Sequence, residues 1–432
     1  MSEEAAAKRV SWVELYFDLI FVFAVGQLSH IMVTDPHWAG LGIALGLFLP
    51  LWWTWVGFAV LYNRHGQDKT AQRLLVLAGT LPCAVAAIET RAAADGHLMT
   101  YTFALAGARL ILAVAFAFTA GTARRVAIGY GLSAAAFAVS AFVPGPWRYV
   151  IWALALLQEA GFLLLRNEEW AEKRHGERTG QHPPARRSRL ESMRAMLKPP
   201  ADPARGVDAG HLAERFGLMI IILLGEVVVA VGSSAAGVPD HGTRYWLGLL
   251  GGLVLAAALW WIYFTAAAPI NEYVLRASGG NPAMAYGLYA AGHLSPAFAL
   301  LVMAAGISLA LSGETPSAAA WFITSGLAVY LAGTRVMTDD GRVRAGPLVR
   351  MSILAATVCL AFLRPLISTT GVVLVATAWA VGLAAYVTWR APGRLKTLAA
   401  DPLSYFRPLP PPPEPQESVP GESAPAEPEP AE

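Results

Sequence analysis

The sequence predicts an all-α polytopic membrane protein, with about twelve transmembrane helices arranged as two parallel six-helix repeats. Composition is the first indication, because 56% of the 432 residues are hydrophobic and only 14% are charged, whereas soluble domains usually carry about 25% charged residues. The second is that the apolar residues form runs long enough to cross about 30 Å of hydrocarbon as helices. The third is that the basic residues gather in alternate loops between these runs.

The first apolar run is expected to be retained as a spanning helix. Residues 1–10 are mostly polar or small, and no small-residue cleavage site closes the run that follows, as a removed signal peptide would require. The apolar runs predict spans at 12–33, 38–61, 71–90, 98–120, 126–142, 147–165, 212–234, 245–267, 283–311, 317–337, 348–366 and 371–389. The fifth of these is short and the ninth is long.

The distribution of lysine and arginine predicts the orientation. If Lys8 and Arg9 are cytoplasmic, alternation of the loops places 26 of the 32 basic residues on the cytoplasmic side, while Arg109 and Arg215 lie inside helices. Only four basic residues fall on the opposite side: Arg91, Arg148, Arg244 and Arg364. This asymmetry is what the positive-inside rule describes for multi-pass membrane proteins, and it predicts that both termini are cytoplasmic.

Four segments follow from this pattern. Residues 1–165 form the first six-helix half, 166–210 a basic cytoplasmic linker, 211–390 the second half, and 391–432 a Pro- and Glu-rich tail that we expect to be disordered. The linker fits either a short surface helix at 186–197 that touches anionic lipid or a plain solvated connection.

The two halves resemble each other weakly. Residues 17–27 align with 216–226, residues 51–53 with 259–261, and residues 120–122 with 332–334. Because each half contains an even number of helices, both halves enter the membrane from the same side. The sequence therefore predicts a parallel repeat whose axis lies along the membrane normal.

Ionisable residues within the apolar runs are the candidate functional residues, because such groups are costly in hydrocarbon and are usually paired or face a cavity. The candidates for binding a substrate or proton are Glu14, Asp18, Arg109, Glu159, Glu214, Arg215, Glu226 and His293. Glu14 and Asp18 share one helix face. Glu14 also fits a capping box with Ser11, and the structural alternative for Asp18 is a buried pair with Arg109 or Arg215.

Arg109 and Glu226 are both expected deep within the bilayer. Glu226 follows Glu214 by twelve residues, which is about 18 Å along a helix. Opposite charges attract strongly in a low dielectric, so we expect Arg109 to pair with Glu226, Glu159 or Asp18. If Glu226 is unpaired, it becomes a candidate proton carrier. We favour a polar cluster that lines a cavity over purely structural pairing.

Three residues have mainly structural interpretations. His293 is more typical of a hydrogen-bonded core histidine than of a ligand, and Pro296, one turn later, is expected to loosen the local backbone. Cys83 and Cys359 lie in apolar runs and are expected to be small core residues.

The motifs of known enzyme classes are missing from the sequence. There is no pair of metal-binding histidines at helical spacing around a glutamate, no phosphate-binding glycine loop and no serine elbow, and the Asp339-Asp340 pair stands alone. We therefore expect no catalytic residues, no metal and no cofactor. The expected partners are membrane lipids and a small solute or proton, and not nucleic acid. No oligomeric state is predicted.

Several of these residues lie in a segment that resembles a known family. The segment ELYFDLIFVFA at 14–24, followed by 27–30, and later 214–218 and 224–226, resembles the bacterial low temperature requirement A family over about residues 10–389. Tyr16, where phenylalanine is often expected, is a mild departure. The resemblance implies a multi-pass bacterial membrane protein, named for a growth defect in the cold. It implies no substrate and no residue roles.

Two functions fit these observations. The first is a transporter or transport-like protein for a small solute or proton, in which Asp18, Arg109 and Glu226 bind or gate the cargo. The second is a non-transporting membrane protein that supports envelope function or growth at low temperature by binding lipid or a partner. In that case the polar residues would be structural.

Overall fold

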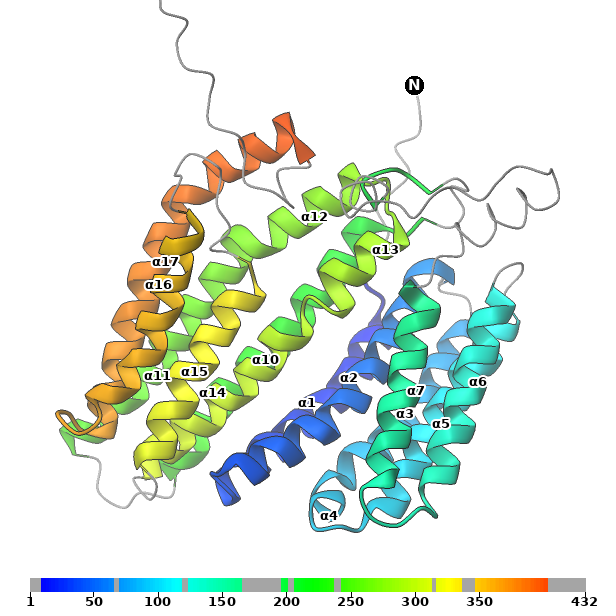
Figure 1. Cartoon of the computed structure of the whole chain (residues 1–432), viewed down its shortest axis with the longest axis horizontal. Helices are drawn as coiled ribbons and strands as arrows, with labels where there is room; N and C mark the ends of the chain where they lie inside the picture. Colours follow the sequence, from blue (N-terminus) through cyan, green and yellow to red (C-terminus); the bar gives the residue numbers. More distant parts are fainter. Residues whose placement is uncertain are drawn as a thin grey trace, which may run out of the picture.

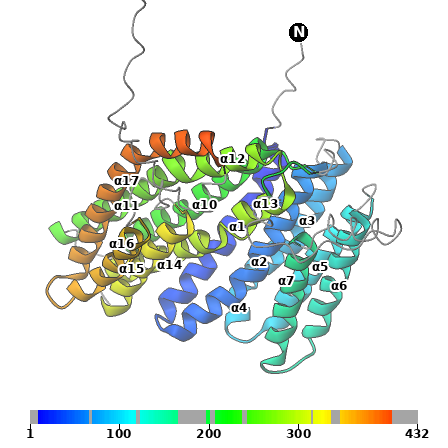
Figure 2. The same ribbon diagram turned by 45° about the horizontal axis from the view of Figure 1, so that its top comes forward.

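The computed structural model describes residues 9–65, 70–118, 123–164, 196–200, 206–236, 242–312, 316–335 and 346–402. Every regular element within these residues is a helix. Figure 1 shows the helices side by side, with those of the first half at one end of the molecule and those of the second half at the other. Figure 2 shows the same division from a second direction.

The helices follow the predicted spans closely. The first half contains α1 (Trp12–Thr34), α2 (Trp38–His65), α3 (Thr70–Ile88), α4 (Thr90–Ala94), α5 (Leu98–Ala117), α6 (Ala123–Ser140) and α7 (Trp147–Leu164). The second half contains α10 (Ala209–Ala236), α11 (Thr243–Ile262), α12 (Ala268–Ala277), α13 (Pro282–Ala285), α14 (Leu294–Ser312), α15 (Pro316–Gly333), α16 (Gly346–Cys359) and α17 (Thr369–Ala400).

Eight helices in the described part of the chain are long and apolar enough to cross a membrane. They are Trp12–Thr34, Trp38–Arg64, Thr70–Ile88, Leu98–Ala117, Ala209–Ser233, Thr243–Ala277, Pro282–Ser312 and Thr369–Ala400. Shorter apolar helices occupy Ser317–Gly333 and Leu348–Leu363. This confirms the prediction of an all-α, multi-pass membrane protein, while the number twelve and the repeat remain predictions.

Two spans of the second half are interrupted. The predicted helix 283–311 is divided into α13, a π-helical segment Tyr286–Ala290, a turn, and α14. A second π-helical segment, Tyr263–Ala267, joins α11 to α12. Each interruption precedes a proline, Pro296 or Pro269, whose missing N–H removes one bond from the helical ladder.

The last helix is longer than predicted. The predicted disordered tail begins at 391, but α17 continues to Ala400. Ala391, Arg394 and Leu398 are buried at the spacing of one helix face, which explains why the helix persists beyond the apolar run. The Pro-rich residues 403–432, the linker residues 166–195 with most of the proposed surface helix, and Asp339-Asp340 lie outside the described residues.

The two cysteines differ in their exposure. Cys83 is buried, whereas Cys359 is exposed, so the prediction that both are core residues is wrong for Cys359. The helix α16 also exposes Leu348 and Met351. An apolar run can face lipid on one side, and for that reason apolar surroundings in the sequence do not imply burial.

The helices α14 and α15 approach each other closely. A Cβ atom added to Gly306 would lie 2.8 Å from Cβ of Phe322 and 2.9 Å from the backbone N of Ile323. Small residues at such crossings allow close van der Waals packing between membrane helices. The absent side chain at Gly306 is therefore part of the packing.

Candidate functional site

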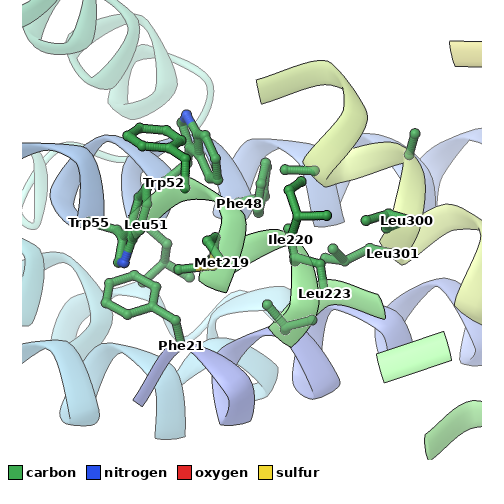
Figure 3. Close-up of a cluster of buried hydrophobic side chains, with 14 of the residues drawn as sticks. Phe21, Phe48, Leu51, Trp52, Trp55, Met219, Ile220, Leu223, Leu300 and Leu301 are labelled. Atoms are coloured by element: carbon green, nitrogen blue, oxygen red, sulfur yellow. The ribbon is translucent and has the colours of Figure 1, made fainter. Parts of the chain in front are cut away.

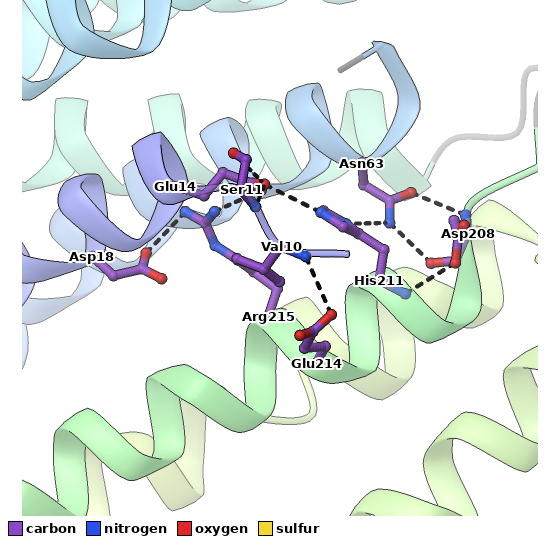
Figure 4. A network of polar contacts seen from close by, with 9 residues as sticks. All are labelled: Val10, Ser11, Glu14, Asp18, Asn63, Asp208, His211, Glu214 and Arg215. Carbon is purple, nitrogen blue, oxygen red and sulfur yellow. Dashed lines mark hydrogen bonds and ion pairs between the residues drawn. The ribbon is translucent and has the colours of Figure 1, made fainter. Parts of the chain in front are cut away.

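The charged residues of α1 are held by an arginine on α10. The Arg215 Nη1 atom lies 2.6 Å from Glu14 Oε1, and Nη2 lies 2.8 Å from Asp18 Oδ1. All three side chains are at most 2% exposed. Figure 4 shows the guanidinium between the two carboxylates. The predicted structural alternative for Asp18, a buried pair with Arg215, is therefore present.

The helix α2 supplies a further donor to the same carboxylate. Trp55 Nε1 donates to Asp18 Oδ1 at 2.7 Å, and the guanidinium carbon of Arg215 lies 5.9 Å from the centre of the Trp55 ring. Oδ1 of Asp18 therefore accepts from both an indole and a guanidinium. Its Oδ2 atom has no hydrogen-bond partner among the described residues.

A histidine and an asparagine extend this network toward the start of α10. Asn63 accepts from the backbone N–H of Asp208 through Oδ1 at 3.1 Å and donates to the Asp208 carbonyl through Nδ2 at 2.9 Å. The amide orientation is thereby fixed, and Nδ2 also faces His211 Nδ1 at 3.1 Å. His211 Nδ1 must then accept, which leaves Nε2–H to donate to Glu14 Oε2 at 3.3 Å.

The two remaining glutamates of this region have structural partners. Glu14 Oε2 accepts from both the backbone N–H and the hydroxyl of Ser11 at 3.0 Å, which confirms the predicted capping box. Glu214 is exposed and accepts from the backbone N–H of Val10 at 3.2 Å. Glu14 thus both caps α1 and pairs with Arg215.

A second buried ion pair lies within the first half. Arg109 Nε donates to Glu159 Oε1 at 2.6 Å, and Nη1 donates to Thr54 Oγ1 at 2.9 Å. The hydroxyl of Ser133 donates to the same glutamate, and the guanidinium lies 4.1 Å from the ring centre of Phe137. Of the three predicted partners, Arg109 takes Glu159, and it pairs with neither Asp18 nor Glu226.

The two ion pairs lie on different faces of α2. Thr54 points to Arg109, and the next residue, Trp55, points to Asp18. Consecutive side chains of an α-helix diverge by about 100°. The expectation that Asp18, Arg109, Glu159 and Glu226 form one polar cluster is therefore wrong, because α2 separates the pairs.

Glu226 lies at the contact between α10 and α1, where no described basic side chain pairs with it. The Ser29 side chain of α1 lies near its carboxylate, and a Cβ added to Gly26 would lie 3.4 Å from its Oε2 atom. None of the ion pairs formed among the described residues involves Glu226. The side chain is half-buried. This is the unpaired arrangement that the sequence left open.

The contacts between α1 and α10 keep one register. Glu14 contacts His211 and Asp18 contacts Arg215, and the residues of each pair are 197 positions apart. Ser29 and Glu226 are separated by the same number. Figures 1 and 2 show the two helices side by side. A constant separation means that they run in the same direction, and we call their contact surface the α1–α10 seam.

His293 is a hydrogen-bonded core residue, 2% exposed. Its Nδ1 atom lies 2.9 Å from the Leu288 carbonyl, and Nε2 lies 2.7 Å from the hydroxyl of Tyr263. The ring stacks on Tyr289 with 6° between the planes. His293 thus connects the two π-helical segments, because Tyr263 begins one of them and Leu288 and Tyr289 belong to the other.

The sequence comparison identifies the family. A family model described as "Bacterial low temperature requirement A protein (LtrA)" matches residues 9–386. The chain belongs to the LtrA family. The matched part of this LtrA protein includes every candidate residue named above.

One curated relative of this LtrA protein is a Rhizobium meliloti (strain 1021) protein named "Uncharacterized protein RA0937". It is 26% identical over 272 residues, which cover 61% of this chain and 60% of the relative. The match thus spans about 60% of the relative's length. No solved structure matches the LtrA chain.

Three residues of the LtrA site were missed by sequence reasoning: Trp55, Asn63 and His211. A signal existed for His211, because it lies four residues before Arg215 and therefore on the same helix face. Neither Trp55 nor Asn63 carries a comparable signal. The described residues contain no group of three or more His, Cys, Asp or Glu side chains able to hold a metal ion.

Proposed function

We propose that this LtrA-family protein transports a small solute or protons across the bacterial inner membrane. The observation that carries the proposal is the position of Glu226 on the α1–α10 seam. Gly26 and Ser29 of α1 are its neighbours there, and no described basic side chain pairs with it. An ionisable residue within a membrane helix is most often part of a substrate, ion or proton pathway.

The depth of Glu226 supports this role. It lies seventeen residues after Ala209, the first residue of α10, which corresponds to about 25 Å along the helix. A carboxylate without a counter-ion is costly at such a depth. A carboxyl group that gains and loses a proton there, or that binds a cationic solute, avoids a permanent unpaired charge.

The arrangement of the halves also supports transport. The first helices of the two halves, α1 and α10, pack in parallel, as expected for two six-helix repeats related by an axis along the membrane normal. α1 begins and α17 ends at the same face of the molecule in Figures 1 and 2. This agrees with our proposal that both termini are cytoplasmic.

Reconstitution of the purified protein into liposomes tests the proposal. Internal pH and a panel of labelled small solutes would be followed under an imposed pH gradient. We expect uptake by the wild type and a loss of uptake in Glu226→Gln, which keeps the shape of the side chain but cannot exchange a proton. Glu272→Gln, in an exposed ion pair with Arg276, is the matched control. Equal behaviour of wild type and Glu226→Gln across the panel would reject the proposal.

A specific observation favours the second candidate function, a non-transporting protein that supports the envelope or growth in the cold through lipid or partner binding. The guanidinium of Arg109 is bound by Glu159, Thr54 and the Leu105 carbonyl, as in a static helix clamp. If the α1–α10 seam also has only a structural role, Asp18→Asn would lower the amount of folded protein without changing any flux. A changed flux at normal abundance would exclude this function.

A further inference from the structure

The α1–α10 seam carries polar groups at two levels. Asp18 and Arg215 meet at the first level, and Ser29 and Glu226 meet at the second. On both helices the two levels are eleven residues apart, which is about 17 Å along the axis. Eleven residues are close to three full turns, so the polar residues of each helix lie on one face.

Apolar side chains separate the two levels. On α1 these are Phe21 and Val25, which are 5% and 4% exposed, and on α10 Met219 and Leu223, which are 2% and 0% exposed. Figure 3 shows Phe21, Met219 and Leu223 within one apolar cluster, and all four residues belong to the main hydrophobic core. We call these four side chains the apolar layer of the seam. A dry layer of this kind blocks water and ions.

The first level has an unbalanced charge. Glu14 and Asp18 supply two carboxylates, and Arg215 supplies one positive charge. His211 donates to Glu14 through Nε2–H, because its Nδ1 atom accepts from Asn63. Asp18 is 1% exposed, and its Oδ2 atom has no hydrogen-bond partner among the described residues. The uptake of one proton by this cluster would make it neutral.

We propose that the α1–α10 seam is the permeation path, that Asp18 and Glu226 are its two proton-binding residues, and that the apolar layer is the barrier that closes it in this conformation. This inference rests on the transport function proposed above. A proton from water adds to the Asp18 carboxylate to form an O–H group, which weakens the ion pair with Arg215. When the seam opens and water enters between the two levels, the proton leaves Asp18, is carried by this water to the Glu226 carboxylate, and departs to water on the far side.

Cysteine accessibility tests the path without relying on transport. In a Cys83→Ala/Cys359→Ser background, a single cysteine is introduced by Gly26→Cys at the second level or by Ala213→Cys near the first. An added Cβ at Gly26 meets only Glu226, at 3.4 Å, so the substitution is sterically acceptable, and Ser29→Cys provides a near-isosteric second variant. A membrane-impermeant thiol reagent is applied to right-side-out and inverted vesicles.

We expect the Gly26→Cys and Ser29→Cys variants to react only from the side where α1 ends, and the Ala213→Cys variant only from the side where α1 begins. Adding Met219→Ala, or the milder Val25→Ala, should make the thiol of Gly26→Cys reactive from both sides. The proposed path is contradicted if neither Gly26→Cys nor Ser29→Cys reacts with the reagent from any side of the membrane. It is also contradicted if these variants react from both sides without Met219→Ala or Val25→Ala.

The outcomes separate this inference from the transport function. If flux depends on Glu226 while the thiols of Gly26→Cys and Ser29→Cys stay unreactive, the transport function is supported and the proposed path through the seam is rejected. A different outcome is that Gly26→Cys reacts from one side only, and from both sides once Met219→Ala is added, but no solute or proton moves in liposomes. In that case the barrier is supported and the transport function is rejected.

Discussion

Arg215 on α10 donates to Asp18 on α1 at 2.8 Å, across 197 residues of sequence and between the two halves of the chain. The same guanidinium lies 2.6 Å from Glu14. A buried ion pair of this kind is costly to break, because the remaining charge has neither water nor a partner. The pair therefore fixes the position of α1 relative to α10.

We expect Arg215→Gln to destabilise the protein strongly, by about 3–5 kcal/mol, since it leaves two buried carboxylates without a counter-ion. Asp18→Asn should cost less, because Arg215 keeps its contact with Glu14. The double variant Asp18→Asn/Arg215→Gln should recover part of the stability that Arg215→Gln loses. The thermal midpoint of the detergent-solubilised protein, followed by tryptophan fluorescence, provides the measurement.

The exposed pair between Glu272 and Arg276, also at 2.6 Å, is the matched control. Arg276→Gln should change the stability by at most about 1 kcal/mol, because exposed ion pairs are screened by water. If Arg215→Gln is no more destabilising than Arg276→Gln, the seam is not held by its ion pair.

Arg109→Lys tests whether the second ion pair depends on geometry or only on charge. Lysine keeps the positive charge but cannot bind Glu159, Thr54 and the Leu105 carbonyl together, as the forked guanidinium does. We expect a clear fall in the thermal midpoint, with flux per folded molecule unchanged. A variant with wild-type stability would show that charge alone suffices, and a changed flux would place Arg109 in the transport path.

Gly306→Ala should destabilise the contact between α14 and α15. The added methyl group would lie 2.9 Å from the backbone N of Ile323, and backbone cannot move aside as a flexible side chain can, so we expect a cost of about 1–3 kcal/mol. Gly46→Ala in α2, where an added Cβ meets nothing within 4 Å, should be neutral or slightly stabilising. Equal midpoints for the two variants would contradict the close approach of the helices.

Tyr263→Phe should loosen the connection between the π-helical segments. It removes the hydroxyl that lies 2.7 Å from His293 Nε2, and a buried group left without its partner costs about 1–3 kcal/mol. Tyr16→Phe, at a side chain that is 50% exposed, is the control and should leave the stability unchanged. Hydrogen exchange at residues 286–293 should increase in Tyr263→Phe only, and unchanged exchange would exclude this anchoring role.

The sequence predicted the helices well, because length and hydrophobicity alone decide whether a segment crosses a membrane. It also named Arg215 as one of two partners for Asp18, and Glu159 as one of three for Arg109. The sequence did not predict which of these partners Asp18 and Arg109 would each bind. That depends on helix rotation, as the divergence of Thr54 and Trp55 on α2 demonstrates.

Other parts of the site had no sequence signal. Asn63 lies near the end of a helix and joins the network only because the start of α10 packs against it. The π-helical segments could not be predicted from hydrophobicity, since a one-residue shift of the hydrogen-bond ladder leaves the apolar pattern nearly unchanged. Glu226 was expected to be either paired or free, and tertiary packing leaves it without a basic partner among the described residues.

Cross-linking across the seam tests most directly whether transport requires α1 and α10 to move apart. Val25 and Ile222 share the 197-residue separation of the seam contacts and are expected to face each other. In the cysteine-free background, Val25→Cys/Ile222→Cys joined by a short, reducible bifunctional thiol reagent should lose proton or solute uptake in liposomes. Reduction should restore the uptake, and the uptake by the Ile222→Cys single variant should be unaffected by the reagent. Normal uptake by the fully cross-linked protein would show that the seam does not open during transport.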